Sequence, residues 1–302
     1  MKISVLGSDG TALCQINSLR QAFSSLGYEH TPDFYDESVS FVFVGNPPYQ
    51  KYKEIFKTDK KIILNVLDIP WHVPEIEEFI KSMDQSLSIA DKVTTISKTV
   101  ANDISETFGI NPDVIYYPMK NVKRTGDKEI KNLKAAIVGR VRDKNKYAAS
   151  AIQALLNAGI KEDEIAIVGP EYFGVGRNMG VVNDETLEKI YNSVDYVVML
   201  DRVAGIGLPA IEGACCGAIP IVASHLTTLD EFWSLSPLYE KYKKLKSITD
   251  ISNLISEIEN NYDLKENLKI ECCAYANLFL KNKFNPKEVA KKIINSYESI
   301  KK

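Results

Sequence analysis

The sequence predicts an α/β protein made of two doubly wound, Rossmann-like domains. Its 302 residues exceed the size at which single cores usually divide. Short apolar runs alternate with helical patterns in both halves, which is typical of βαβ units. A polar, highly charged stretch from 121 to 132 interrupts this alternation. We therefore expect one domain over 1–122 and a second over 123–302.

The first domain is expected to begin with a strand over 2–7, a turn at Gly7-Ser8-Asp9-Gly10, and a helix whose apolar positions recur from 13 to 26. Further apolar runs predict strands over 41–44, 62–67, 93–96 and 114–117. Helical spacing predicts helices over 75–89 and 99–108. This alternation of strands and helices is typical of a parallel sheet.

The second domain repeats the rhythm, with strands expected over 135–138, 165–168, 196–200 and 219–223. Helices are expected over 148–157 and 185–192, from Leu208 onward, and from Asp250 to the end of the chain. Gly174, Gly176 and Gly180 do not fit the dinucleotide fingerprint, so we expect a loop there.

Composition excludes several classes of protein. The hydrophobic fraction is 45% and the charged fraction 25%, which is enough apolar material for packed cores. No apolar run approaches the roughly 20 residues of a membrane-spanning helix, and we expect a cytoplasmic protein. The five cysteines lack C-x-x-C spacing and are expected to be buried in a reducing compartment; with three histidines, no metal site is expected.

Charge is distributed unevenly along the chain. Residues 1–122 carry a net charge of −5 and residues 123–302 a net charge of +2, so an anion is expected in the second half. Nine of the residues from 123 to 146 are basic, and we interpret the first half of this cluster as a solvated linker. A pI of about 5.8 gives no nucleic-acid signal.

Basic side chains follow the strand expected over 135–138. Gly139 is followed by Arg140, with Lys144 and Lys146 a few residues later. Ligands of parallel sheets bind beyond the carboxyl ends of the strands. A planar guanidinium beside a mobile ammonium suits a diphosphate, and exposed loop charges are the alternative.

A glycine-rich turn precedes the helix expected from Leu208. Gly205 and Gly207 let backbone amides approach a ligand, and Pro209 fits a first helical turn. The helix N-terminus favours phosphate, and Glu212 can accept hydrogen bonds from ligand hydroxyls. A purely structural turn is the alternative.

An ordered series of motifs resembles the retaining glycosyltransferases of family 4, which have the glycosyltransferase B fold. From 205 to 224 the chain reads Gly-Ile-Gly-Leu-Pro-Ala-Ile-Glu-Gly-Ala-Cys-Cys-Gly-Ala-Ile-Pro-Ile-Val-Ala-Ser, which is similar to the family's donor signature G-F-G-L-P-x-x-E-A-M-A-C-G-x-P-V-V-A-S. Val138-Gly139-Arg140 resembles its phosphate-contacting segment. Leu26-Gly27-Tyr28-Glu29 and Val93-Thr94-Thr95-Ile96-Ser97 resemble its N-terminal motifs.

The resemblance implies a hexosyltransferase-type enzyme that needs no metal or other cofactor and binds a nucleotide-diphosphate sugar, with UDP or GDP as nucleotide, in a cleft between two facing domains. Arg140 with Lys144 or Lys146 would hold the pyrophosphate, and Glu212 the ribose. The remaining donor contacts would come from residues around the base, sugar and opposite domain: Val181, Val182, Gly205, Ile206, Gly207, Leu208, Gly7 and Gly10.

The resemblance also assigns the acceptor, an unknown glycan, lipid-linked or other molecule, to the first domain. The donor would belong to the second domain. A terminal helix over about 286–302 would cross back toward the first domain. Its lysines are expected to be solvated, and contact with an anionic membrane surface is the alternative.

Two departures from the family pattern fall near the expected sugar. Ala204 stands where the family often has Glu, and Leu67-Asp68 stands where it often has His-Asp. Asp201 is a candidate substitute for the carboxylate, and His72 for the imidazole. The losses keep two other hypotheses open: a catalytically silent nucleotide- or glycan-binding accessory protein, and an epimerase of the same fold.

Overall fold

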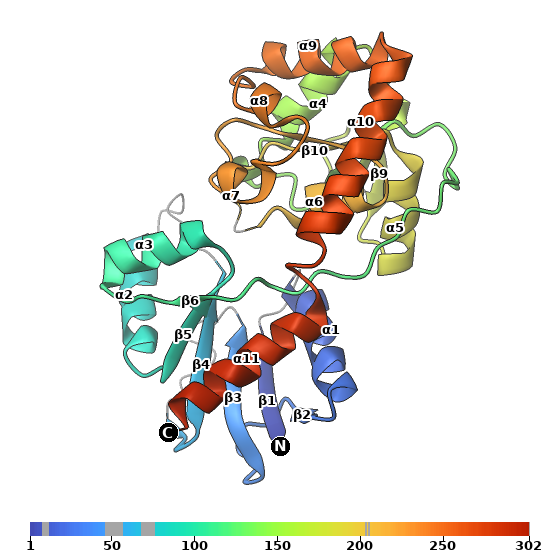
Figure 1. The fold of residues 1–302 in the computed structure, drawn as a ribbon. Helices are drawn as coiled ribbons and strands as arrows, with labels where there is room; N and C mark the ends of the chain where they lie inside the picture. Colours follow the sequence, from blue (N-terminus) through green and yellow to red (C-terminus); the bar gives the residue numbers. More distant parts are fainter. Residues whose placement is uncertain (8–11, 46–56, 68–75, 203, 205, 302) are drawn as a thin grey trace. The chain divides into compact units, whose positions relative to one another are not determined.

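The computed structural model describes residues 1–301 except 8–11, 46–56, 68–75, 203 and 205. The chain forms two compact units, one of Met1–Lys120 with Lys283–Lys302, the other of Asn121–Asn282. Each unit contains one parallel sheet with helices packed on it (Figure 1). The predicted α/β class with two Rossmann-like sheets is confirmed.

The first sheet has the strand order β2-β1-β3-β4-β5-β6. Its strands are β1 (Lys2–Gly7), β2 (Glu29–Thr31), β3 (Val39–Gly45), β4 (Lys61–Val66), β5 (Lys92–Thr95) and β6 (Asp113–Val114). The central strands are almost wholly buried, as expected where helices cover both faces of a parallel sheet. The strand expected over 114–117 is shorter and begins at Asp113. The edge strand β2 was not expected.

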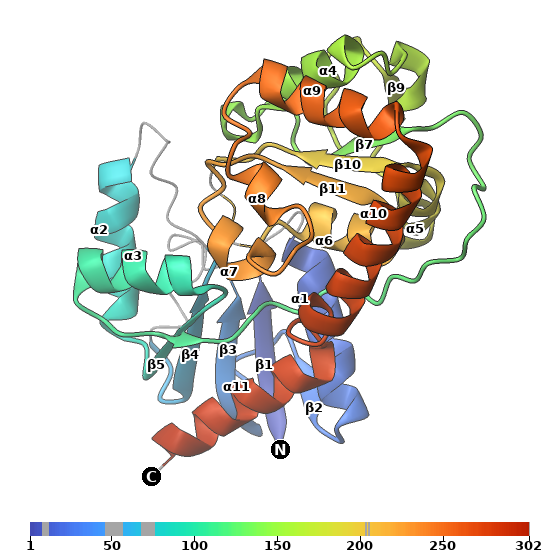
Figure 2. The same cartoon turned by 45° about the horizontal axis from the view of Figure 1, so that its top comes forward.

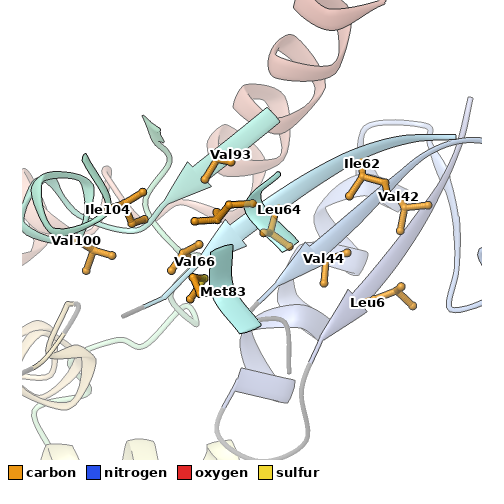
Figure 3. Packing of buried hydrophobic residues seen from close by; sticks show 11 residues of the cluster. Leu6, Val42, Val44, Ile62, Leu64, Val66, Met83, Val93, Val100 and Ile104 are labelled. Carbon is orange, nitrogen blue, oxygen red and sulfur yellow. The ribbon is translucent and has the colours of Figure 1, made fainter. Parts of the chain in front are cut away.

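Alternate residues of these strands point to opposite faces of the sheet. One face packs against α2 (Ile76–Leu87) and α3 (Lys98–Phe108), forming a core that includes Val44, Leu64, Met83 and Ile104 (Figure 3). The other face packs against α11 (Pro286–Ile300), which also contacts α1 (Ala12–Ser25).

The last helix therefore covers the first sheet. The ring of Tyr297 on α11 stacks on Phe41 of β3, with centroids 4.5 Å apart. Both side chains are buried, and Val289, Ile293 and Ile294 add further apolar area from the same helix. The terminal segment is thus an integral part of the first unit's core.

The second sheet has the order β11-β10-β7-β8-β9. Its strands are β7 (Ala135–Val138), β8 (Ile165–Val168), β9 (Arg177–Gly180), β10 (Tyr196–Met199) and β11 (Ile219–Val222). The chain adds β8 and β9 on one side of β7, then returns to add β10 and β11 on the other. The direction of winding therefore reverses between β7 and β10. Part of the loop expected around Gly174 is the strand β9.

Helices cover both faces of this sheet (Figure 2). One face carries α4 (Ala148–Asn157) and α9 (Ile248–Glu259). The other carries α5 (Asp184–Ser193), α6 (Leu208–Cys215) and α10 (Tyr262–Tyr275). Two short helices were not expected, α7 (Leu229–Trp233) and α8 (Tyr239–Tyr242).

Tight helical turns complete the second unit. They are the 3₁₀ turns η2 (Lys144–Lys146) and η3 (Glu162–Glu164) and the π turn η4 (Ala276–Leu280). Cys215, Cys216 and Cys272 are buried, as predicted, whereas Cys273 is half-buried and its thiol donates to the carbonyl of Cys215 at 3.4 Å, where α10 packs against α6. Burial raises the pKa of Cys215 and of Cys272 to about 12, so both thiols stay protonated near neutral pH. Among the described helices, none is long and apolar enough to cross a bilayer.

Candidate functional site

The point where the winding of the second sheet reverses lies between β7 and β10. Open parallel sheets bind ligands just beyond the carboxyl ends of their strands at such a point. Two segments meet there, the turn after β7 and the loop after β10: the amide of Arg202 donates to the carbonyl of Asn145 at 3.0 Å. The residues predicted to bind a diphosphate belong to these segments.

Glycines directly follow β7 and β8, so no side chain extends from these two strand ends. Gly139 and Gly169 have φ of 132° and 151°, in the range that favours glycine. A Cβ atom on Gly169 would lie 2.0 Å from the carbonyl oxygen of Gly139. The two strand ends therefore approach more closely than any other residue at 169 would allow.

Lys146 and Asp201 form an ion pair across the reversal point. The side chain of Asp201 is only 5% exposed, and that of Lys146 is 29% exposed. Burial raises the pKa of Asp201 although the ammonium of Lys146 acts to lower it. This pair holds one cationic group at the carboxyl ends of β7 and β10.

Arg140 and Lys144 are arranged differently from Lys146. The guanidinium of Arg140 is 68% exposed and contacts Asp143 at 3.3 Å. Such an exposed pair contributes little, so the guanidinium can accept a second anion at small cost. Lys144 is exposed and has no ion-pair partner in the part of the chain that the structure describes. Lys144 and Lys146 are two positions apart in the η2 turn, and in a 3₁₀ helix this spacing corresponds to a rotation of about 240°. Their side chains therefore point in different directions, and of the two only Lys146 reaches Asp201.

The start of α6 follows the loop after β10. Gly207 precedes the helix with φ of 83°, and a Cβ there would lie 2.6 Å from Cε of Met199. Ile206 is buried and Leu208 half-buried. The carbonyl of Ala204 accepts a hydrogen bond from Thr228 at 3.2 Å. Gly205 lies outside the described residues.

Glu212 lies one turn into α6 and is buried. Its Oε2 accepts a hydrogen bond from the hydroxyl of Tyr191 at 3.1 Å. Burial and the neighbouring Glu212 carboxylate raise the pKa of Tyr191 well above its usual value, so the hydroxyl stays protonated and donates. Tyr191 on α5 is a positioning partner of Glu212 that the sequence did not reveal.

The other predicted donor contacts are more dispersed. Val181 is strongly exposed and Val182 half-buried, directly after β9 at the same edge of the sheet. Gly7 ends β1 in the first unit, where a Cβ would lie 2.4 Å from Cγ1 of Ile16. Leu67 is half-buried after β4. Gly10, Asp68 and His72 lie outside the described residues.

His225 also lies at this edge of the second sheet. Its Nε2 is 3.0 Å from the carbonyl oxygen of Leu200, and its ring lies 5.4 Å from that of Tyr147. Among the described residues, no group of three or more His, Cys, Asp or Glu side chains could hold a metal ion. Lys146 and Asp201 form the ion pair at the reversal point, and the ring of His225 lies beside them through its contact with Leu200.

Comparison with solved structures identifies the fold. Sucrose-phosphate synthase from Thermosynechococcus elongatus matches with a TM-score of 0.77 over 99% of both chains, at 12% identity. HepE from Anabaena, solved with UDP-glucose, matches with a TM-score of 0.72 over 99% of this chain and 100% of its own, at 13% identity. A glycosyltransferase from Rickettsia africae matches with a TM-score of 0.69 over 100% and 98%, at 13% identity.

These neighbours share the glycosyltransferase B fold, and this chain has the same fold. No protein-family model matches the sequence, and no curated protein does.

Proposed function

We propose that the protein is a metal-independent glycosyltransferase related to the retaining enzymes of family 4. It would move a sugar from a nucleotide-diphosphate sugar to an acceptor, with retention of configuration. The observation that carries the proposal is the ion pair between Lys146 and Asp201 at the reversal point of a glycosyltransferase B sheet. UDP is the preferred nucleotide, because the neighbour HepE was solved with UDP and with UDP-glucose.

The proposed diphosphate site uses Arg140 and Lys146. The exposed guanidinium of Arg140 would contact the diphosphate as a planar fork, and the ammonium of Lys146 would contact it as a point charge. The N-terminus of α6 after Gly207 adds free backbone N–H groups and a partial positive charge. Lys144 is left out of this site because it lies on the other side of the η2 turn.

These groups account for the chemistry that such a transfer requires. When the bond between the anomeric carbon and the diphosphate oxygen breaks, negative charge develops on the departing diphosphate. Fixed cations and backbone dipoles stabilise that charge without a metal ion. In the free protein Asp201 holds Lys146 in place, and we assign Asp201 the role of positioning this ammonium.

The remaining contacts follow from the order of the strands. Backbone around Val181 and Val182 would meet the base, and the turn from Gly205 to Leu208 would face the sugar. Glu212, held by Tyr191, would orient the ribose. Gly7 and Gly10 belong to the unit that we assign to the acceptor, and residues 121–282 form the donor unit.

Binding measurements on single variants test the diphosphate site. We expect UDP to bind the wild-type protein and to bind Arg140→Ala and Lys146→Gln roughly 10 to 100 times more weakly, because each variant loses a charge-assisted hydrogen bond. The glutamine can still donate to Asp201, which keeps the fold intact. Lys144→Gln is the matched control and should bind UDP as the wild type does.

Calorimetric titrations with UDP, GDP and ADP measure these affinities. Equal affinity of wild type and Arg140→Ala for every nucleotide, or no binding by either, contradicts the proposed site.

The second candidate is a catalytically silent binding protein of the same fold. It is favoured by Ala204, where the family often has a carboxylate and where this chain has a buried methyl group. Slow hydrolysis of UDP-sugars without an acceptor, unchanged by a chelator, is expected of the enzyme. Tight UDP-sugar binding with no release of free sugar, and no transfer to any glycan acceptor, identifies the silent protein.

A further inference from the structure

A second polar site lies at the amino ends of the strands of the second sheet, whereas the proposed donor site lies at their carboxyl ends. A cavity of about 390 Å³ opens beside the amino ends of β10 and β11. Six charged side chains line it: Arg124, Lys128, Asp195, Lys265, Glu266 and Lys269. Asp195 and Asp201 lie just outside the two ends of β10, six residues and therefore about 20 Å apart. The cavity is thus separate from the proposed donor site.

Three lysines converge on one buried carboxylate in this cavity. Asp195 accepts hydrogen bonds from Lys128 at 2.8 Å, from Lys265 at 2.8 Å and from Lys269 at 2.6 Å. The side chains of Lys265 and Lys269 are only 14% and 12% exposed. Burial alone would raise the pKa of Asp195, but the three ammonium groups lower it well below its usual range.

The lining has more hydrogen-bond donors than the protein uses. An ammonium has three donors. Within the described part of the chain, Lys128 uses one for Asp195, Lys265 uses two for Asp195 and Glu259, and Lys269 uses two for Asp195 and Glu266. The guanidinium of Arg124 has no hydrogen-bond or ion-pair partner among the described residues. It lies against Gly217, where a Cβ atom would be 2.8 Å from its Nε.

The charges of the lining are also unbalanced. Four cationic side chains of the lining face two carboxylates, Asp195 and Glu266. Outside the lining, Glu259 pairs with Lys265 and also with Lys134, which adds one charge of each sign and leaves the surplus at two. A network that only fastened α10 to β10 would need no Arg124 and no Lys128, which come from the linker before β7. Two members of the basic cluster over 123–134, Arg124 and Lys128, therefore line the same cavity as Lys265 and Lys269, which lie more than 100 residues later in the chain.

We propose that this cavity binds the phosphate group of a small phosphorylated molecule. A phosphate dianion would neutralise the two surplus positive charges and accept hydrogen bonds from the unused donors. Exposed Tyr262 at the rim of the cavity would contact the organic part of the ligand. The same chemistry fits a soluble phosphate ester and the headgroup phosphate of a lipid.

The test is calorimetric titration of the full chain with inorganic phosphate and with glycerol 3-phosphate, at constant ionic strength. We expect both to bind, and Arg124→Ala and Lys128→Ala each to weaken binding at least tenfold. Both side chains are largely solvent-accessible, so these variants keep the fold. Lys131→Ala is the matched control: it removes an exposed lysine of the same linker that does not line the cavity, and it should change nothing.

Two further arms identify the source of the phosphate and separate this site from the donor site. Vesicles containing phosphatidic acid that bind the wild type but not Arg124→Ala indicate a lipid headgroup; binding of the soluble esters alone indicates a free metabolite. Arg140→Ala should leave phosphate binding at the cavity unchanged, whereas Arg124→Ala should leave UDP binding unchanged. Absence of phosphate binding by the wild type, or affinities equal in wild type, Arg124→Ala and Lys128→Ala, overturns the proposal.

Discussion

In the variant Gly213→Ala, helix propensity and side-chain packing have opposite effects on the stability of α6. Alanine is favoured over glycine in a helix interior by about 1 kcal/mol, so propensity alone predicts a more stable protein. In the structure, however, a Cβ on Gly213 would lie 2.4 Å from Cγ2 and 2.9 Å from Cβ of Val197. Carbon atoms in contact prefer about 3.5 to 4.0 Å. The helix would therefore have to move about 1 Å away from β10.

The expected cost follows from these distances. Inserting a methyl group into a packed core costs about 1 to 3 kcal/mol, and the upper end applies because Val197 is a fully buried strand residue that cannot move aside. After the gain in propensity is subtracted, we expect Gly213→Ala to lower the free energy of unfolding by about 2 kcal/mol. The same shift would displace Gly207 and the start of α6, so UDP affinity should also fall.

Urea unfolding followed by circular dichroism measures the effect. The second variant is Val197→Ala, which removes Cγ2, the atom that the new Cβ would approach most closely. In the double variant the costs should not add, because the alanine at 213 then fills the space left at 197. An increase in stability of about 1 kcal/mol in Gly213→Ala alone would refute the argument, since propensity would then have outweighed packing.

Three further predictions concern other parts of the molecule. Tyr191→Phe removes the hydrogen bond to the buried Glu212 carboxylate, and the free energy of unfolding should fall by about 1.5 to 3 kcal/mol in a urea titration, together with UDP affinity. Asp195→Asn leaves buried lysines without their carboxylate and should cost about 3 kcal/mol at pH 7. Because folding lowers the pKa of Asp195, the carboxylate contributes its full stabilisation above its unfolded pKa of about 3.9 and loses it as the pH falls toward its folded pKa. The difference in free energy of unfolding between wild type and Asp195→Asn should therefore narrow below about pH 4, which unfolding measured at a series of pH values would show. Tyr297→Ala uncovers Phe41 and should destabilise the first unit by about 3 kcal/mol, with its unfolding separating from that of the second unit in a thermal scan.

The buried strands could be predicted from the sequence because parallel strands covered on both faces are continuous apolar runs. β4 and β8 are examples, and both were placed within one residue. The edge strands β2 and β9 were missed, because residues such as Glu29 and Asn178 are exposed there and give no apolar pattern. Helical periodicity predicted α11, but the expectation that it crosses toward the first domain came only from the family resemblance, because its contact with Phe41 joins residues far apart in the sequence.

The sequence was sufficient to predict which strand ends carry the candidate site, but not which side chains meet there. The position of Arg140 after β7 follows from the sequence, but the choice between Lys144 and Lys146 required the register of the η2 turn. Tyr191, the hydrogen-bond partner of Glu212, lies on another helix, and no local sequence pattern predicts such a contact. The cavity beside Asp195 was missed for the same reason, because Arg124 and Lys128 of the linker line it together with Lys265 and Lys269, which are distant in the sequence.

The discontinuous first unit has a consequence for biosynthesis. Residues 1–120 leave the ribosome long before α11, and about 160 residues must be translated in between, which takes roughly 10 to 30 s. During that interval the Phe41 face of the nascent sheet is bare, because the second unit is itself still being translated. Newly made chains are therefore most prone to aggregation, and most in need of a chaperone, before their final helix emerges.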